Sequence, residues 1–352
     1  MNLNERKLKI LQAIVSDFIR SAEPVGSRTL SRKYGMGISP ATIRNEMADL
    51  EEMGFLTHPY TSAGRVPSTK AYRLYVDGLM ERYELSEEEK HRIREKLDTT
   101  IMELDRTVEQ AAKLLSELTN LTSFAMTPRK HDDYLRYVNF IPVDSDTVVL
   151  VLVAESGKAS NTTLKIKVPY REEHLELLAK VITYNYKGRK LTDILTMDII
   201  RDFESDIAVM SRLAESIMPK FMATLEGMLD AELYLDGLMN IFTLPEYSDI
   251  EKARMFLETI SKKKFTEVLI NRENGVIITI GDEHPDEILK DYSLITATYQ
   301  INGKNIGKLG VIGPTRMQYD HVTSVIEYMT QHLSQAFITG GEEDEEKERP
   351  DG

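Results

Sequence analysis

Residues 38–56, ISPATIRNEMADLEEMGFL, carry the signals that begin and end one short helix. Ser39 is a good N-cap, and Pro40 follows it at the first helical position, where no backbone N–H is needed. Gly54 is the usual kind of residue for a left-handed helix stop. Between these ends runs an apolar stripe at helical spacing, formed by Ile43, Met47 and Leu50. The stretch therefore predicts a helix with one buried side.

The opposite side of this helix is small and polar at its leading end, where it carries Ala41, Thr42, Arg44 and Asn45. A helix with such an end can enter the major groove of DNA. Asn45 has the side chain that can bond adenine with two hydrogen bonds, and Arg44 suits guanine or phosphate. The alternative is that both are ordinary solvated residues on an exposed helix face.

The segments around this helix predict a helix-turn-helix with a wing. Apolar residues three or four apart indicate a first helix over 4–20, and Ser27 caps a second over 28–33. Residues 34–37 supply the turn before the helix already described. Residues 55–67 then predict a β-hairpin wing, in which Arg65 stands beside a turn glycine and is placed to reach phosphate or the minor groove.

The charge distribution supports this N-terminal DNA-binding domain. The 352 residues carry a net charge of −13 and suggest two or three domains. Residues 1–80 hold 11 Lys/Arg and 8 Asp/Glu, which leaves +3 there and −16 elsewhere. Because +3 is modest, phosphate contacts alone favour binding as a dimer. The absence of cysteine excludes disulfides and thiolate chemistry and fits a reducing compartment, so the expected location is the cytoplasm.

The rest of the chain predicts an α+β sheet domain with a helical insertion. Apolar residues spaced four and three apart from 93 to 118 form a seam that either pairs two subunits or lies on a sheet, at equal odds. Strand patterns occur at 122–127, 135–142, 147–154, 162–168, 265–271, 276–280, 293–301 and 308–312. They are interrupted by helical spacing over about 172–240. A helix closes the fold at 322–337, and the acidic residues after 340 predict disorder.

Signals for an enzyme or a cofactor are poor. The seven histidines show neither the HExxH spacing nor a metal-type cluster. The glycines of residues 302–316 lack the GK[ST] ending of a phosphate-binding loop, and turns at strand ends explain them better. No apolar run approaches the ~18 residues of a membrane span. We expect no enzyme activity, no metal, no cofactor and no membrane association.

Several of these stretches resemble one family closely. Residues 38–54, 58–68 and 71–77 are similar to the recognition helix, wing and exit helix of the bacterial heat-inducible transcription repressor family HrcA. Residues 236–241 and 310–319 (GVIGPTRMQY) resemble signatures near the other end of that family. The resemblance spans nearly the whole chain, is weakest around residues 155–230 and is absent in the acidic tail.

The resemblance implies a winged helix-turn-helix, a GAF-like α/β domain and a helical dimerising insertion. The corresponding domains are a winged-helix DNA-binding domain at 1–82, a linker helix at 83–103, a first GAF-like part at 104–168, the inserted dimerising domain at 169–232, a second GAF-like part at 233–340 and the disordered acidic tail at 341–352. The implied function is repression of chaperone operons by a homodimer bound to an inverted-repeat operator called CIRCE. The implied regulator is the chaperonin GroEL, which keeps the repressor active until heat stress.

The predicted DNA-binding residues come from the recognition helix, the helix before it and the wing: Arg28, Ser39, Ala41, Thr42, Arg44, Asn45, Tyr60 and Arg65. The expected partners are double-stranded operator DNA, a second copy of the chain and a GroEL-type chaperonin, with nucleoid association when DNA is bound. An alternative function is a regulator that senses a small molecule in its GAF-like domain. The sequence shows neither a chromophore cysteine nor a nucleotide pocket, so we do not expect such a ligand.

Overall fold

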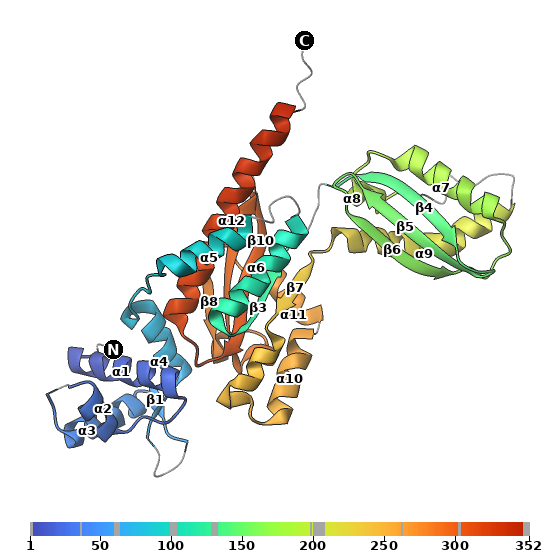
Figure 1. Cartoon of the computed structure of the whole chain (residues 1–352). Helices are drawn as coiled ribbons and strands as arrows, with labels where there is room; N and C mark the ends of the chain where they lie inside the picture. Colours follow the sequence, from blue (N-terminus) through green and yellow to red (C-terminus); the bar gives the residue numbers. More distant parts are fainter. Residues whose placement is uncertain are drawn as a thin grey trace. The chain divides into compact units, whose positions relative to one another are not determined.

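The computed structural model describes residues 3–35, 37–59, 64–98, 104–127, 133–197, 199, 208–261, 263–301 and 304–347. The chain divides into two compact units (Figure 1). The first unit joins Met1–Thr127 to Leu233–Gly352, and the second is Pro128–Glu232. The second unit is thus an insertion in the first.

The first unit begins with a small helical domain, which we call the N-terminal domain. Its elements follow the predicted order: α1 (Glu5–Ser21), α2 (Ser27–Lys33), α3 (Pro40–Glu52), β1 (Leu56–Thr57), β2 (Val66–Pro67), α4 (Thr69–Leu74) and the π-helical turn η1 (Tyr75–Leu79). Asn4 caps α1 by accepting a hydrogen bond of 2.8 Å from the Lys7 N–H. The two short strands pair antiparallel. The predicted helices and the predicted hairpin are therefore present.

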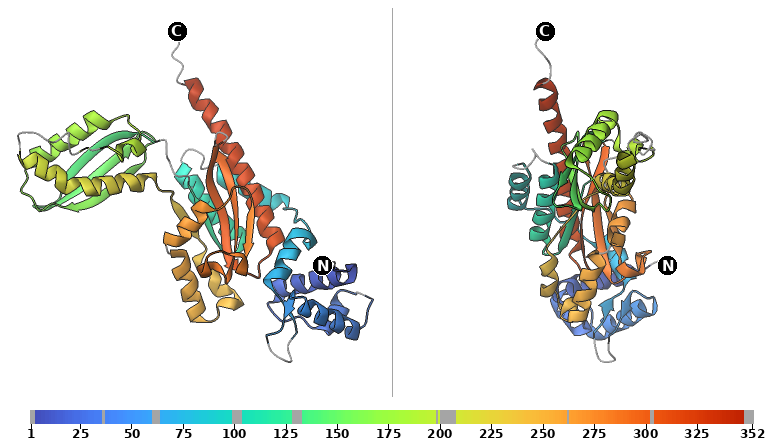
Figure 2. Two further views of the ribbon diagram at one scale, coloured as in Figure 1. Left: turned by 180° about the vertical axis from the view of Figure 1, so that it is seen from behind. Right: turned by 90° about the vertical axis from the view of Figure 1, so that its right-hand side faces the viewer.

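A five-stranded antiparallel sheet of order β7-β3-β10-β9-β8 forms the remainder of the first unit. Its strands are β3 (Thr122–Met126), β7 (Leu233–Asp236), β8 (Ile277–Ile280), β9 (Tyr292–Ile301) and β10 (Lys304–Pro314). One face packs against α6 (Leu104–Thr119) and α12 (Tyr319–Lys347), with α5 (Glu87–Asp98) against both helices. The other face carries α10 (Ile250–Ser261) and α11 (Lys263–Asn271), so the sheet lies between two helix layers (Figure 2). Short 3₁₀ turns complete the unit: η3 (Leu238–Thr243), η4 (Pro245–Tyr247), η5 (Gly281–Glu283) and η6 (Glu287–Leu289).

Helices α6 and α11 bear on two expectations from the sequence, one left open and one wrong. The apolar seam of residues 93–118 packs within the unit, and its α6 part lies on the sheet, which was one of its two predicted roles. The predicted strand at 265–271 is wrong, because these residues belong to α11. Phe265 and Leu269 are buried four residues apart, a spacing that a short apolar run shares with a helix. Lys308 Nζ donates to the Leu269 carbonyl at 2.8 Å and stabilises the end of that helix.

The second unit is a mixed α/β fold rather than a helical one. Its three antiparallel strands, in the order β4-β5-β6, are β4 (Leu135–Pro142), β5 (Thr147–Ala154) and β6 (Ala159–Lys165). Its helices are α7 (Glu172–Tyr186), α8 (Leu191–Ile194) and α9 (Ala208–Leu229). The predicted boundary at residue 169 is corrected, because β4–β6 form their own sheet and share a core with α7 and α9. Strand patterns alone do not indicate which sheet a strand joins.

The acidic tail also differs from its predicted disorder, since α12 continues through residues 341–347. Glutamate is a good helix former, and extending a helix costs less than nucleating one. The first part of α12 is already anchored by buried residues such as Val322, Ile326 and Leu333. Composition predicts the solvation of such a segment better than its backbone conformation.

His284 makes stability depend on pH. Its side chain is buried, and burial together with the nearby charge of Arg272 lowers the pKa of His284 to about 4. Between pH 6.5 and 4 the unfolded chain binds a proton there that the folded chain does not, so stability falls as the pH falls. The pKa difference corresponds to about 3 kcal/mol. We expect urea unfolding of His284→Gln to lose this part of the pH slope, and a slope equal to wild type would contradict the assignment.

Candidate nucleic-acid interface

The leading end of α3 is built as the sequence predicts. Ser39 accepts a hydrogen bond from the Thr42 N–H at 3.1 Å, and the two hydroxyl oxygens lie 3.0 Å apart. Pro40 occupies the first helical turn, and Gly54 has a φ of +78° just beyond the helix end. An L-residue with a side chain is disfavoured at that φ, so glycine fits the position.

Three of the predicted contact residues are exposed near this end of α3: Ala41 in the first turn, and Arg44 and Asn45 in the second. Ser39 is exposed as well, and Thr42 is half-buried beside it. The side chains of Arg44 and Asn45 make no hydrogen bond or ion pair with any residue that the structure describes. Their donors and acceptors are therefore free to bind another molecule.

The other side of α3 fixes the helix to the N-terminal domain. Its buried residues are Ile43, Met47 and Leu50, as the apolar stripe predicts. Lys7 of α1 adds two ion pairs, with Nζ 2.7 Å from a Glu46 oxygen and 2.8 Å from an Asp49 oxygen. These contacts leave only the polar side and the N-terminal turn of α3 open to a ligand.

Arg28 lies on α2, the helix that packs against α3, and its side chain is exposed. It too makes no hydrogen bond or ion pair with a described residue. Because α2 begins at Ser27, Arg28 belongs to the first turn of its helix. A guanidinium there is suited to contact a phosphate.

The base of the hairpin is held against the loop between α1 and α2. Val25 and Arg65 exchange two backbone hydrogen bonds of 2.9 Å. A Cβ on Gly64 would lie 2.6 Å from the Val25 carbonyl carbon and oxygen, so only glycine permits this approach. Tyr60, the predicted contact at the hairpin tip, lies outside the described residues.

The Arg65 side chain has a partner that the sequence did not indicate. Its Nε lies 2.7 Å from Oε2 of Glu51, in the last turn of α3. The other oxygen of Glu51 pairs with Nδ1 of His58, next to β1. One carboxylate thus joins α3 to both sides of the hairpin. No spacing rule predicts this pair, because its members meet only after the chain turns.

Arg65→Ala is expected to weaken binding to operator and unrelated DNA by a similar factor. A residue that contacts phosphate contributes to affinity but not to base preference, and its loss lowers the salt dependence of log K by about one. Fluorescence anisotropy titrations at several salt concentrations measure both effects. Glu51→Gln, which releases the guanidinium without removing it, is the control and should keep the salt dependence. A changed preferred sequence in Arg65→Ala would contradict a phosphate role.

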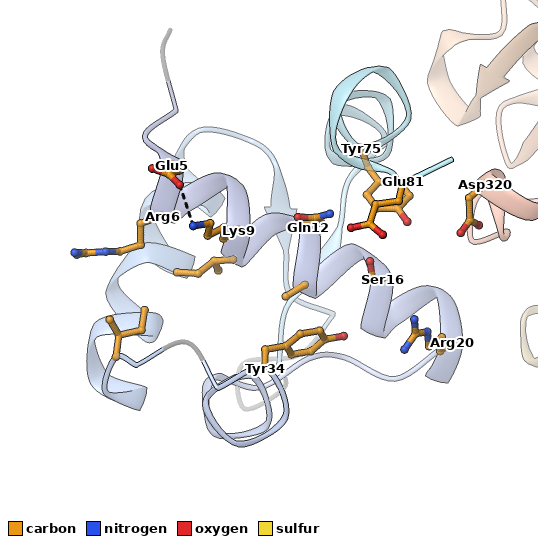
Figure 3. Close-up of a pocket in the computed structure, with 13 residues that line it drawn as sticks. Glu5, Arg6, Lys9, Gln12, Ser16, Arg20, Tyr34, Tyr75, Glu81 and Asp320 are labelled. Atoms are coloured by element: carbon orange, nitrogen blue, oxygen red, sulfur yellow. Dashed lines mark hydrogen bonds and ion pairs between the residues drawn. The ribbon is translucent and has the colours of Figure 1, made fainter. Parts of the chain in front are cut away.

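The N-terminal domain also borders a cavity of 780 Å³, drawn in Figure 3. Basic and acidic side chains line it together, among them Arg6, Lys9, Arg20, Glu81 and Asp320. Lys9 is already paired with Glu5 at 2.9 Å (Figure 3). The opening therefore carries charges of both signs and has no net preference for an anion or a cation.

Within the described ranges, no cluster of three or more His, Asp or Glu side chains could hold a metal ion. No helix of that same part of the chain is long and apolar enough to cross a membrane.

Comparisons with known proteins point to the same family along almost the whole chain. Residues 105–323 match the family model described as the HrcA protein C terminal domain. The heat-inducible transcription repressor HrcA of Clostridium acetobutylicum is 40% identical over 95% of this chain and 97% of its own length. The heat-inducible transcription repressor HrcA of Alkaliphilus metalliredigens is 40% identical over 95% of this chain and 98% of its own length. A crystal structure described only as a hypothetical protein is 25% identical, covers 96% of this chain and 99% of its own, and has a TM-score of 0.60.

An exposed helix end with free polar side chains, on a helical domain joined to α/β sheets, fits the class of transcription repressors that the relatives define. The chain belongs to the HrcA family of heat-inducible transcription repressors. Repression of transcription implies DNA as a partner. Transcription repressors are not enzymes, and this agrees with the poor enzyme signals of the sequence.

Proposed function

We propose that this chain represses chaperone operons by binding an inverted-repeat operator of the CIRCE type as a homodimer, with activity maintained by a GroEL-type chaperonin. The observation that carries the DNA part is the exposed leading end of α3, where the side chains of Arg44 and Asn45 have no partner among the described residues. These side-chain types form the two-pronged hydrogen bonds that distinguish guanine and adenine in the major groove.

The arrangement of the N-terminal domain supports a winged helix-turn-helix. α2 packs against α3, and α1 contacts both of them, which is the packing that presents a recognition helix. The antiparallel pair β1–β2 follows α3 directly and is joined to it through Glu51. In this proposal α3 enters the major groove, and Arg28 and Arg65 contact the flanking phosphates.

The second unit supports dimerisation through one face of its sheet. The buried face of β4–β6 packs against α7 and α9. The opposite face has three cross-strand rows without a charged residue: Tyr137, Val153 and Ala159; Asn139, Val151 and Asn161; Ile141, Val149 and Thr163. The next row, in which Thr147 opposes Lys165, places one exposed lysine at the end of this face. Tyr137 and Ile141 are 48% and 46% exposed. The face of a sheet that meets water is usually polar, whereas an exposed apolar face marks an interface.

A second copy of the chain fits this face better than a charged partner. In a twofold dimer the same patch meets itself, so any charge near the axis would oppose a like charge. The three central rows contain no charge, and Lys165 lies in the row beyond them, at one end of the face. Two such faces can pack as aligned sheets with their side chains interdigitated. An inverted repeat has the same symmetry as this dimer, with one recognition helix for each half-site.

The connectivity of the first unit supports dependence on a chaperonin. Strand β3 pairs with β10, where Met126 opposes Lys308, and with β7, where Met126 opposes Leu233. Every pairing of β3 therefore waits for segments beyond the insertion. Such non-local pairing folds slowly and leaves apolar surface exposed meanwhile, and this is the state that a chaperonin binds.

A gel-shift assay on the inverted repeat, with and without chaperonin, tests the proposal together with a mass measurement of the free protein. We expect a shift that a scrambled repeat does not compete for, a mass of twice the 40.2 kDa of one chain, and a larger active fraction after refolding with chaperonin. Lasting full activity after refolding alone at growth temperature would contradict the chaperonin part. Such a repressor acts in the cytoplasm, at the nucleoid when bound.

A further inference from the structure

The N-terminal domain and the five-stranded sheet share one continuous core. The buried cluster that includes Ile14 and Leu50 extends through Tyr72 to Tyr319 and the sheet residue Leu309. The rings of Tyr72 and Tyr319 lie 6.0 Å apart, and both side chains are almost fully buried. An apolar contact of this kind holds two bodies together, but it is non-directional and does not by itself fix their orientation.

Arg73 of α4 makes the first directional contact between the two bodies. Its Nε donates to Oε1 of Glu283 at 2.7 Å, and one terminal nitrogen donates to Oε2 of the same residue and to the Ile278 carbonyl. Burial acts to raise the pKa of Glu283, but the hydrogen bonds from Arg73 and from the Ile280 N–H outweigh it and lower the pKa below its ordinary value. The carboxylate therefore stays charged and paired at neutral pH.

Arg316, which follows β10, makes the second contact from the sheet side. Its Nε lies 2.6 Å from Oε1 of Glu246 and another nitrogen lies 3.1 Å from Oε2. The remaining terminal nitrogen donates to the Ile19 carbonyl, in the last turn of α1. The guanidinium side chain is 13% exposed. A charge-assisted bond to a free carbonyl at a helix C-terminus is both directional and favourable.

These two contacts join different helices of the N-terminal domain to different parts of the sheet region. Arg73 joins α4 to the β8–η5 corner, and Arg316 joins the end of α1 to η4. Two directional contacts, added to the apolar contact of Tyr72 and Tyr319, oppose rotation of one body on the other. Arg73 makes its paired bonds to a carboxylate across the joint, and such bonds carry geometric specificity. Arg316 is held in place by the carboxylate of Glu246 in its own body and crosses to the N-terminal domain through one bond to the Ile19 carbonyl.

We propose that Arg73 and Arg316 are positioning residues that determine which half-site spacing the dimer accepts. The inference rests on the proposed function, since it concerns the pairing of two recognition helices. One base pair added between half-sites turns one of them by about 35° and moves it by about 3.4 Å. A dimer rejects such a repeat only if the joints between its interface and α3 resist that rotation. Arg73 and Arg316 make the directional contacts described above across the joint between the N-terminal domain and the sheet.

The test compares operators whose half-sites are separated by one base pair more or fewer than in the natural repeat. Wild type should bind the natural repeat about tenfold or more tightly than either altered one, and Arg73→Ala/Arg316→Ala should discriminate less than about threefold. Glu246→Gln/Glu283→Gln should lose spacing selectivity in the same way. These carboxylates lie in the sheet region, and their removal makes the protein less acidic, so lost phosphate contacts cannot explain their effect.

Arg82→Ala is the matched control. It removes an arginine whose pair with Glu327, at 3.4 Å, is largely exposed, and it should keep the wild-type spacing profile. A profile unchanged in both double variants overturns the inference, as does a wild type indifferent to spacing. A wild type that does not bind the natural repeat at all would instead contradict the proposed function.

A measurement without DNA tests whether the two arginines fix the orientation of the N-terminal domain, independently of operator binding. Because the chain has no cysteine, Thr29→Cys on α2 and Lys252→Cys on α10 give two unique sites for spin labels. Both positions are exposed. In labelled chains diluted with a large excess of unlabelled protein, the distance distribution should be narrow for wild type and clearly broader in both double variants. Equal widths in these folded variants would overturn the positioning role, whatever the operator results.

Discussion

Val151→Lys is expected to convert the protein from a dimer to a monomer. Val151 lies in β5, the middle strand of the β4–β6 sheet, and in the middle one of the three uncharged cross-strand rows, between Asn139 and Asn161. In a dimer built on that face, the lysines of the two copies would be buried close to each other, and a buried unpaired charge is costly. Losing the second half-site contact should lower operator affinity by about a hundredfold or more. Sedimentation equilibrium and gel shift measure the two effects.

Leu177→Lys is the matched control for this change. Leu177 is 45% exposed on α7 in the same unit, so the substitution adds the same charge and removes a similar aliphatic side chain. This variant should remain a dimer with wild-type affinity. A dimeric Val151→Lys protein of unchanged stability would place the interface elsewhere.

Arg44→Ala and Asn45→Ala are expected to lower operator affinity by about 1–3 kcal/mol each. Each side chain is free in the protein, so its hydrogen bonds to a base are gained without breaking an internal one. The loss should fall mainly on specific binding, because the phosphate contacts from other residues remain. Footprinting on the inverted repeat and on scrambled DNA separates specific from non-specific loss.

Lys9→Ala serves as the control for these variants, because it removes one positive charge from an exposed position of α1. It should change affinity far less than Arg44→Ala. Operator protection equal to wild type in both α3 variants would contradict the assignment of α3 as the recognition helix.

The helix α3 could be predicted because every signal for it is local. Ser39 and Pro40 define its start, Gly54 defines its end, and the apolar stripe gives its buried side. The structure has each of these features where the sequence places it. The same holds for β4 and β5, whose observed bounds match the predicted strands at 135–142 and 147–154.

The insertion and the ion pairs could not be predicted because they depend on distant partners. β5 alternates between buried and half-buried residues whichever sheet it joins, so its pattern says nothing of the separate β4-β5-β6 order. Glu51 and Arg65 are 14 positions apart, and Arg73 and Glu283 are 210 apart. The sequence shows that a charged side chain needs a partner or water, but it does not show which residue is the partner.

The place where the insertion leaves the sheet has a consequence for how this repressor could be rebuilt. Met126 at the end of β3 lies directly opposite Leu233 at the start of β7, as hydrogen-bonded neighbours. A two-residue turn can connect antiparallel neighbours of that kind. The whole of Pro128–Glu232 is therefore exchangeable for a short turn. If the insertion pairs two copies as proposed, that exchange would leave a single-copy protein, and a different symmetric module grafted at the same two ends would pair the two α3 helices with a new geometry.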